Sequence, residues 1–203
     1  MYPVAYDQQP PEERNRLTLF FRYFTAIPHF IVLAFLGIAV FFTLIAAWFA
    51  VVVTGRYPVG LYTFHAGVTR WITRVQAYFH CVVDAYPPFS LDDDPSYPVR
   101  VGFAPPRAEY NRLKAAFRLI LAIPVALVLY VMQLWLGAVA IALWIVGVFT
   151  GRTSAGLTEA VRIPLAYYAR ATAYLYLLTE DWPPFDPGRG ELTAPPQPAG
   201  LST

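Results

Sequence analysis

The chain has 203 residues, of which 57% are hydrophobic and 14% are charged, and its formal net charge is +2. Soluble domains carry about 25% charged residues, so this composition favours a membrane protein and argues against a soluble enzyme. The small net charge gives no indication of a nucleic-acid partner. The single cysteine, Cys81, excludes an intrachain disulfide and a cysteine-rich metal site.

The sequence contains one unit twice. Residues 15–89 align with residues 111–185 at a shift of 96 without a gap, and 25 of the 75 aligned positions are identical. We therefore expect four parts: a first membrane repeat at 12–89, an Asp- and Pro-rich linker at 90–107, a second membrane repeat at 108–185 and a disordered tail at 186–203.

Each unit begins with a short amphipathic segment, residues 14–27 in the first unit. Its aromatic residues recur at helical spacing with arginines between them, which predicts a helix lying in the headgroup region of a bilayer. Pro28 follows, and the residue before a proline disfavours helical geometry. We therefore expect a bend at Pro28 from the interface into the bilayer, and the same at Pro124.

A long apolar run comes next in each unit. Residues 28–53 and 124–149 are each 26 residues without a formal charge. A helix of that length measures about 39 Å, and a hydrocarbon core of about 30 Å needs only about 20 residues. Helices buried in soluble proteins rarely stay apolar on all sides for this long. We expect both runs to span a membrane.

A polar turn ends each long run, and a second amphipathic helix follows it, at 61–83 and at 157–178. Each second helix has an arginine-bearing face, so it either spans with that face toward the protein interior or lies flat on the membrane.

The distribution of Lys and Arg favours the spanning alternative. If each unit is a two-helix hairpin, the N-terminal arm, linker and tail carry 9 cations on one side, against 2 in the turns. Both termini are then cytosolic. A re-entrant fold of each long run would also place the charges on one side, but Gly37 and Gly137 do not occupy matching positions and so give no shared hinge.

Two groups of residues are candidates for contacts with the membrane. Arginines that recur in the units are candidate lipid or anion contacts, because a guanidinium matches phosphate geometry: Arg22, Arg70, Arg74, Arg118, Arg162 and Arg170. Aromatic and basic residues at the turns and unit ends are candidate interface anchors: Arg56, Tyr57, Tyr86, Phe89, Arg152, Trp182 and Phe185.

Catalytic chemistry is not indicated. The three histidines have no familiar metal spacing and no counterpart in the other unit, and the sequence contains no nucleophile elbow, P-loop or dinucleotide fingerprint. We expect no catalytic residue, no bound metal and no cofactor.

The first unit resembles the bacterial family called domain of unknown function 4389. The resemblance rests on the Arg-Leu-x-x-x-Phe-Arg segment at 16–22, on Ala-Ile-Pro-His at 26–29, on the turn at 54–61 and on Tyr-Pro-Pro-Phe at 86–89. The second unit departs from it at Thr153, Ser154 and Trp182. The resemblance implies a tandem-domain bacterial membrane protein and supplies no activity.

Together these features predict an all-α membrane protein of the bacterial cytoplasmic membrane. We expect a non-enzymatic scaffold or accessory subunit that contacts the lipid bilayer, anionic headgroups, and a membrane-protein partner or a second copy of itself. The alternative is an anion channel or transporter that uses the arginine-bearing helices.

Overall fold

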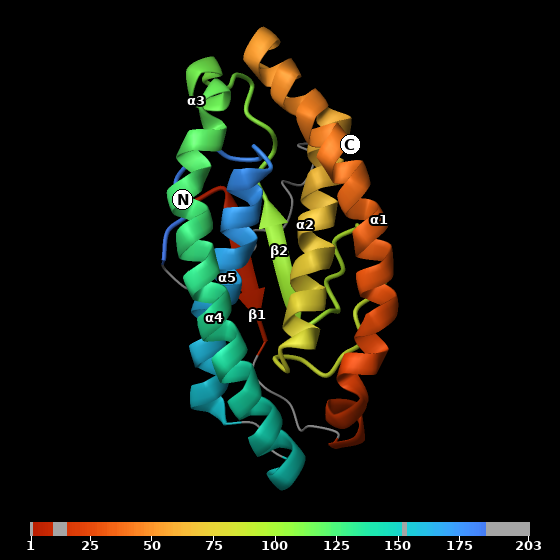
Figure 1. Cartoon of the computed structure of the whole chain (residues 1–203). Coiled ribbons are helices and arrows are strands. Elements are labelled where there is room, and N and C mark those ends of the chain that lie inside the picture. The colour runs from red at the N-terminus through yellow and green to blue at the C-terminus, as the bar shows by residue number, and fades with distance from the viewer. Residues whose placement is uncertain (1, 10–15, 152–153, 186–203) are drawn as a thin grey trace, which may run out of the picture.

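The computed structural model describes residues 2–9, 16–151 and 154–185, which are mostly helical (Figure 1). In chain order the described elements are β1 (Val4–Gln8), α1 (Arg16–Thr54), α2 (Val59–Phe79), β2 (Val99–Phe103), α3 (Arg112–Ala116), α4 (Arg118–Thr150) and α5 (Ala155–Leu175). The expected tail at 186–203 lies outside the described residues, as do residues 12–15 of the first repeat.

The first long helix does not break at its proline. Helix α1 runs for 39 residues with Pro28 inside it, so the prediction of a separate interfacial helix is wrong for this unit. Side-chain contacts with α2 hold both halves of α1 in line. The Thr25 hydroxyl lies 2.7 Å from the Tyr78 hydroxyl on one side of the proline, and the Thr43 hydroxyl lies 2.9 Å from Nε2 of His65 on the other.

The second unit has a break, but not at the expected position. The short helix α3 ends at Ala116, Phe117 with backbone angles of φ −88° and ψ 12° separates the helices, and α4 begins at Arg118. Pro124 lies inside α4, so it does not produce the predicted boundary.

The helices of each unit end in the same way at matching positions. Gly55 and Gly151 follow the long helices with left-handed φ angles of 72° and 68°, a conformation that glycine adopts without steric cost. Cys81 and Leu177 follow α2 and α5 and are also left-handed, with φ near 62°. The next amide in each case bonds back five residues, which closes the last helical turn.

The expected linker contains a strand that pairs with the N-terminal arm, a pairing that departs from the expected all-α fold. Strands β1 and β2 form an antiparallel ribbon in which Ala5 faces Gly102 and Tyr6 faces Val101. The 96-residue shift maps Ala5 onto Val101 and Tyr6 onto Gly102. The ribbon is therefore symmetric under exchange of the units, and each structural unit is a strand followed by a helical hairpin.

The two units are related by an approximate two-fold rotation, and their contacts are reciprocal. The indole N–H of Trp48 donates to the Ala115 carbonyl at 2.9 Å, and that of Trp144 donates to the Leu19 carbonyl at 3.2 Å. A shift of 96 maps each member of one pair onto a member of the other. Such contacts are the intramolecular equivalent of a self-complementary dimer interface.

This symmetry corrects the expected topology. The turn at Gly55 lies beside Tyr110 and Arg112, whereas the turn at Gly151 lies beside Arg16. Helices α1 and α4 are therefore antiparallel and the two turns lie at opposite ends of the molecule, so two spanning hairpins in this arrangement would not place both turns on the same side of a membrane, as was predicted. The physical cause is the linker, which pairs with β1 and returns along the molecule before α3 begins.

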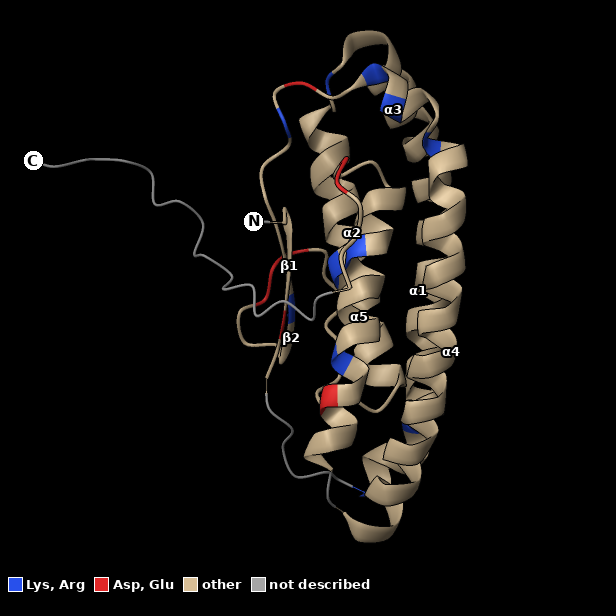
Figure 2. Cartoon of the chain, turned by 90° about the vertical axis from the view of Figure 1, so that its left-hand side faces the viewer, with Lys and Arg blue, Asp and Glu red and all other residues tan. Residues whose placement is uncertain are grey.

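The elements form three layers, seen edge-on in Figure 2. Helices α1 and α4 form one outer layer, α2 and α5 form the middle layer, and the ribbon with the linker forms the other outer layer. Exchange of the units keeps every layer in place, so the two-fold axis runs across the layers. The core lies around the middle layer, where most residues of α2 and α5 are buried.

Candidate functional site: an apolar face above buried arginines

The main candidate for a functional surface is the outward face of α1 and α4. Apolar side chains along the full length of both helices are more than half exposed; they include Phe24, Phe35, Phe42, Val53, Leu119, Leu127, Leu134 and Phe149. Residues 23–55 and 119–151 contain no charged residue. Both helices are long and apolar enough to cross a membrane, and only 11% of the most apolar 18-residue stretch of each is buried. They are therefore not core helices of this chain.

Exposed cations lie at the ends of this apolar layer. Arg16 lies beside the turn at Gly151, and Arg112 lies beside the turn at Gly55. Arg56 and Lys114 are also exposed, at the turn after α1 and in α3. The charged residues thus frame the apolar surface instead of interrupting it.

The opposite face is polar and mainly acidic. It exposes carboxylates from the ribbon, the linker and the start of α5: Asp7, Asp92, Asp93 and Glu159. Arg100 pairs with Asp93 at 2.6 Å. The molecule is therefore amphipathic across its layers, with an apolar side and an acidic side.

The recurring arginines lie inside the molecule rather than on its surface. Arg22 is 0% exposed, pairs with the Asp84 carboxylate and donates to the Tyr78 carbonyl at 2.8 Å. Its counterpart Arg118 is 4% exposed and lies 3.9 Å from the centre of the Tyr174 ring. In this fold both guanidinium groups join the first turns of a long helix to the end of its partner helix, a structural role different from the lipid contact expected.

Arg74 and Arg170, which occupy matching positions, also hold segments together. Arg74 donates to the Asp92 carbonyl at 2.7 Å and lies over the Tyr97 ring. Arg170 contacts the Pro184 carbonyl at 3.4 Å and lies over the Tyr2 ring. Each arginine therefore joins its helix to residues at or just after the end of its own unit and to a tyrosine that precedes a strand of the ribbon.

The electrostatics around these two tyrosines follow from burial. Burial raises the pKa of Tyr97 and of Tyr2 above the usual value, and nearby arginines oppose the rise. Both phenols therefore stay neutral and act as hydrogen-bond donors, Tyr97 to the Ala85 carbonyl and Tyr2 to the Asp181 carbonyl.

The remaining two candidate arginines are not matched between the units. Arg70 donates through Nε to the Val101 carbonyl at 3.1 Å, which attaches α2 to the ribbon. Arg162 lies 4.0 Å from both Asp7 and Glu159 and is partly exposed. Both face the ribbon layer and not the apolar layer.

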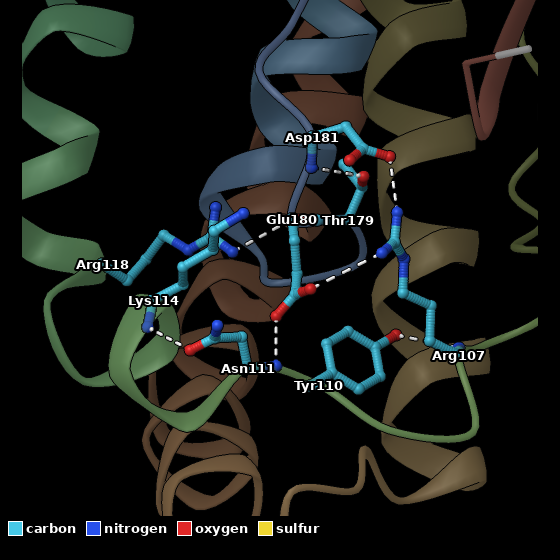
Figure 3. Close-up of polar contacts among 8 residues, drawn as sticks. All are labelled: Arg107, Tyr110, Asn111, Lys114, Arg118, Thr179, Glu180 and Asp181. Carbon is cyan, nitrogen blue, oxygen red and sulfur yellow. Dashed lines mark hydrogen bonds and ion pairs between the residues drawn. The ribbon is translucent and has the colours of Figure 1, made fainter.

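A polar cluster closes the second unit (Figure 3). Arg107 lies 2.6 Å from the Asp181 carboxylate and 3.6 Å from that of Glu180. Glu180 also accepts from the backbone amide of Asn111, and Arg118 donates to the Thr179 carbonyl at 3.1 Å. These contacts join the segment after α5 to the segment that leads into α3 and α4, so the cluster fixes the end of α5 against the start of α3.

The candidate interface anchors separate into three groups. Tyr57 is buried, and its hydroxyl contacts Nδ1 of His65 and donates to the Tyr176 carbonyl, so it is a core residue. Arg56 is exposed, whereas Arg152 lies outside the described residues. The four aromatic residues of the closing segments are about half exposed: Tyr86, Phe89, Trp182 and Phe185.

The closing aromatics pack on the helical hairpins in equivalent places. The Phe89 ring centre lies 5.6 Å from that of Trp71 on α2, and the Phe185 ring centre lies 5.2 Å from that of the matching Tyr167 on α5. The Pro-Pro-Phe segments therefore fold back along the hairpins, which is a structural reason for their recurrence.

The part of the chain described by the structure offers little for catalysis. Within it, no group of three His, Cys, Asp or Glu side chains is placed to hold a metal. A recess of about 280 Å³ lies at one end, lined by residues such as Arg56, Glu109 and Arg112. It is open and sits beside the turn at Gly55, away from the buried arginines.

Sequence reasoning missed the ribbon and the residues that attach it. Val4–Gln8 and Val99–Phe103 are each five residues long and share no repeated motif, so their pairing gave no local signal. The unit-to-unit contacts were detectable in principle, because Trp48 and Trp144 are identical residues at matching positions.

Comparison with known proteins adds the family and nothing beyond it. The family described as a domain of unknown function (DUF4389) matches residues 16–90 and again residues 112–186. No curated protein and no solved structure matches the chain. The two matches together cover most of the chain, and they coincide with the two helical hairpins that the approximate two-fold axis relates. The chain therefore belongs to the DUF4389 family and carries two tandem copies of its domain.

Proposed function

We propose that this chain is a non-enzymatic membrane protein of the bacterial cytoplasmic membrane that acts as a scaffold or accessory subunit. The observation that carries the proposal is the uninterrupted, exposed apolar layer of α1 and α4 opposite an acidic ribbon layer. An apolar surface of this extent is rare on soluble monomers and is typical of lipid or protein contact. The acidic layer is then the side available to a partner in water.

Membrane association can be tested on the apolar layer directly. We expect the tagged chain to remain in membranes washed with alkaline carbonate. A double variant, Phe35→Asp with Leu134→Asp, places a charge at an exposed position of each long helix, and each charge costs about 2.5–3.5 kcal/mol in a bilayer. We expect the membrane-bound fraction to fall at least about tenfold. Glu159→Gln on the acidic layer is the matched control and should leave it unchanged.

The scaffold role can be tested on the acidic layer. A photocrosslinking residue in place of Asp93 should capture one defined protein at near-stoichiometric yield in cells, whereas the same residue in place of Phe35 should react with lipid. If the chain stays in the membranes of these cells but gives no defined protein adduct from position 93, the scaffold role is contradicted. The membrane association is then unaffected.

The alternative of an anion channel or transporter receives less support from the geometry. A channel needs arginines that face a water-filled path, whereas Arg74 and Arg170 lie against backbone carbonyls and tyrosine rings. We expect liposomes containing the chain to release chloride no faster than empty liposomes. Chloride release that disappears in an Arg74→Gln, Arg170→Gln variant that still folds would favour the channel.

A further inference from the structure

The apolar layer is too long for the helices to cross a bilayer upright. Exposed apolar residues extend from Leu17 to Val53 on α1 and from Leu119 to Phe149 on α4. At about 1.5 Å per residue these stretches measure about 54 Å and about 45 Å. Fitting them into a hydrocarbon core of about 30 Å would need tilts of about 56° and about 48°, beyond the range of about 0–40° seen for membrane-spanning helices.

The linker raises a second difficulty for an upright orientation. Its contacts follow α2 from Arg74 back to its first turn: Asp92 meets Arg74, Val101 meets Arg70, and Ala104 meets Tyr62. Non-helical backbone therefore runs along most of α2, on the outer side of the middle layer. Lipid-exposed irregular backbone and open sheet edges do not occur in the hydrocarbon region, because their polar groups would lack partners.

The charged residues of the ribbon layer add to this cost. Asp7 and Asp93 lie on or next to the ribbon, which is placed midway along the helices and not at their ends (Figure 2). An upright molecule would hold these carboxylates near the middle of the bilayer. Charged side chains there are costly and require shielding from lipid.

We propose that the molecule lies flat, with the α1–α4 layer embedded in one leaflet of the bilayer and the ribbon layer in water. This inference rests on the proposed membrane location and specifies the orientation within it. The whole apolar stretch then contacts acyl chains, and the acidic layer faces away from the lipid. The cations at the ends of the apolar layer, Arg16, Arg56, Arg112 and Lys114, lie at headgroup level, where anionic phospholipids attract them.

The approximate two-fold axis fits this orientation. The axis runs across the three layers, so in a flat molecule it stands normal to the membrane. Both units are then embedded to the same depth, which explains why α1 and α4 are equally apolar although they run in opposite directions. In an upright molecule the same axis would lie in the membrane plane and exchange the two sides of the bilayer.

The two orientations differ in which sites share a compartment. The turn after α1 and the start of α5 lie at opposite ends of the molecule. We would place single cysteines at Arg56, Ser154 and Asp93, all exposed, and add a membrane-impermeant maleimide to intact cells and to inverted vesicles. The wild-type chain is the background control, because Cys81 is buried.

A flat molecule predicts that all three cysteines react from one and the same side. Reaction of the Arg56→Cys and Ser154→Cys variants from opposite sides would overturn the proposal and establish spanning helices. Recovery of the wild-type chain in the soluble fraction would instead refute the membrane location itself, so failure of the two proposals can be told apart.

Depth along α1 gives an independent test. Phe24, Phe35 and Phe49 are all more than half exposed on this helix. A fluorophore attached to a cysteine at each position should be quenched by spin-labelled lipids at equal depth, within a few ångströms, if the helix lies flat. An upright helix would place the middle position about 16 Å deeper than the position at 24, since eleven residues separate them.

Discussion

The two units close their helical hairpins with the same residues but with different partners. In the first unit Arg22 pairs directly with Asp84. In the second unit the matching Arg118 donates to a backbone carbonyl, and the matching Glu180 is engaged by Arg107 and by a backbone amide. The position that matches Arg107 in the first unit is Pro11, which carries no charge. Both units therefore keep the arginine that joins the helices. The acidic residue at the end of the hairpin pairs with that arginine in the first unit and with Arg107 in the second.

The largest expected effect comes from breaking the direct pair of the first unit. Arg22→Ala leaves the partly buried Asp84 without its guanidinium, and removing one member of a buried pair costs about 3–5 kcal/mol. Because Asp84 keeps some exposure, we expect a loss near about 3 kcal/mol in urea unfolding of the detergent-solubilised chain. Arg118→Ala should cost about half as much, since its carboxylate neighbour retains other donors.

Matched controls separate this effect from a general loss of charge. Arg56→Ala removes an exposed arginine and should change the free energy of unfolding by less than about 0.5 kcal/mol. The double variant Arg22→Ala, Asp84→Ala should be more stable than the sum of the single losses predicts. Equal losses of unfolding free energy for Arg22→Ala and Arg118→Ala would contradict the difference in pairing between the two units.

The interface between the units provides the next effect in size. A Cβ atom on Gly147 would lie 2.7 Å from Cδ1 of Leu19, so a larger residue there would force the Leu19 side chain to move. The matching pair is Ala115 and Val51, both buried, so α1 supplies the larger residue of each pair: Leu19 near its start and Val51 near its end. Gly147→Val should destabilise by about 2 kcal/mol through overpacking.

A compensating double variant tests whether overpacking against Leu19 causes the loss of stability in Gly147→Val. Leu19→Ala combined with Gly147→Val reproduces the Ala115 and Val51 arrangement at the second contact, and it should recover part of the stability lost in each single variant. Strictly additive losses would show that the two positions do not share one packing volume.

The sequence predicted the helices better than their arrangement, and the reasons are local. Residues 28–53 and 124–149 carry their own signal, because a charge-free run of that length is helical wherever it is buried or embedded. Pro28 was misjudged because contacts to α2 on both sides outweigh a single missing N–H. The inverted second unit depends on pairing between residues about 96 apart, which no local pattern of β1 or β2 reveals.

The candidate arginines also could be found from the sequence, whereas their partners could not. Four of the six occupy matching positions in the two units, and each of these four donates a hydrogen bond to a backbone carbonyl. Whether an arginine points to lipid or to a carbonyl depends on the segment lying over it, and for Arg74 and Arg70 that segment is the linker. Its course could not be deduced from composition.

A smaller effect is expected at the reciprocal tryptophans. Trp48→Phe and Trp144→Phe each remove one indole donor to a backbone carbonyl while keeping an aromatic ring. We expect a loss of about 1 kcal/mol for each, additive in the double variant because the contacts lie at opposite ends of α1. Thermal or urea unfolding of the three variants measures these losses. Clearly unequal losses would show that the two matching hydrogen bonds do not contribute equally to stability.

The smallest effect is expected in the linker, at Asp94. The Ser96 hydroxyl and amide donate to the Asp94 carboxylate and hold its pKa below the usual value. Because the folded pKa is depressed, this stabilisation is present above the unfolded pKa of about 3.9 and is lost as pH falls through the folded pKa. Asp94→Asn should therefore flatten the acid limb of stability below about pH 4 by less than the about 0.5 kcal/mol typical of a surface change. Urea unfolding of the wild-type chain and the variant between about pH 3 and about pH 6 measures this. Parallel acid limbs for the two chains would mean that the turn at Asp94 contributes nothing to stability.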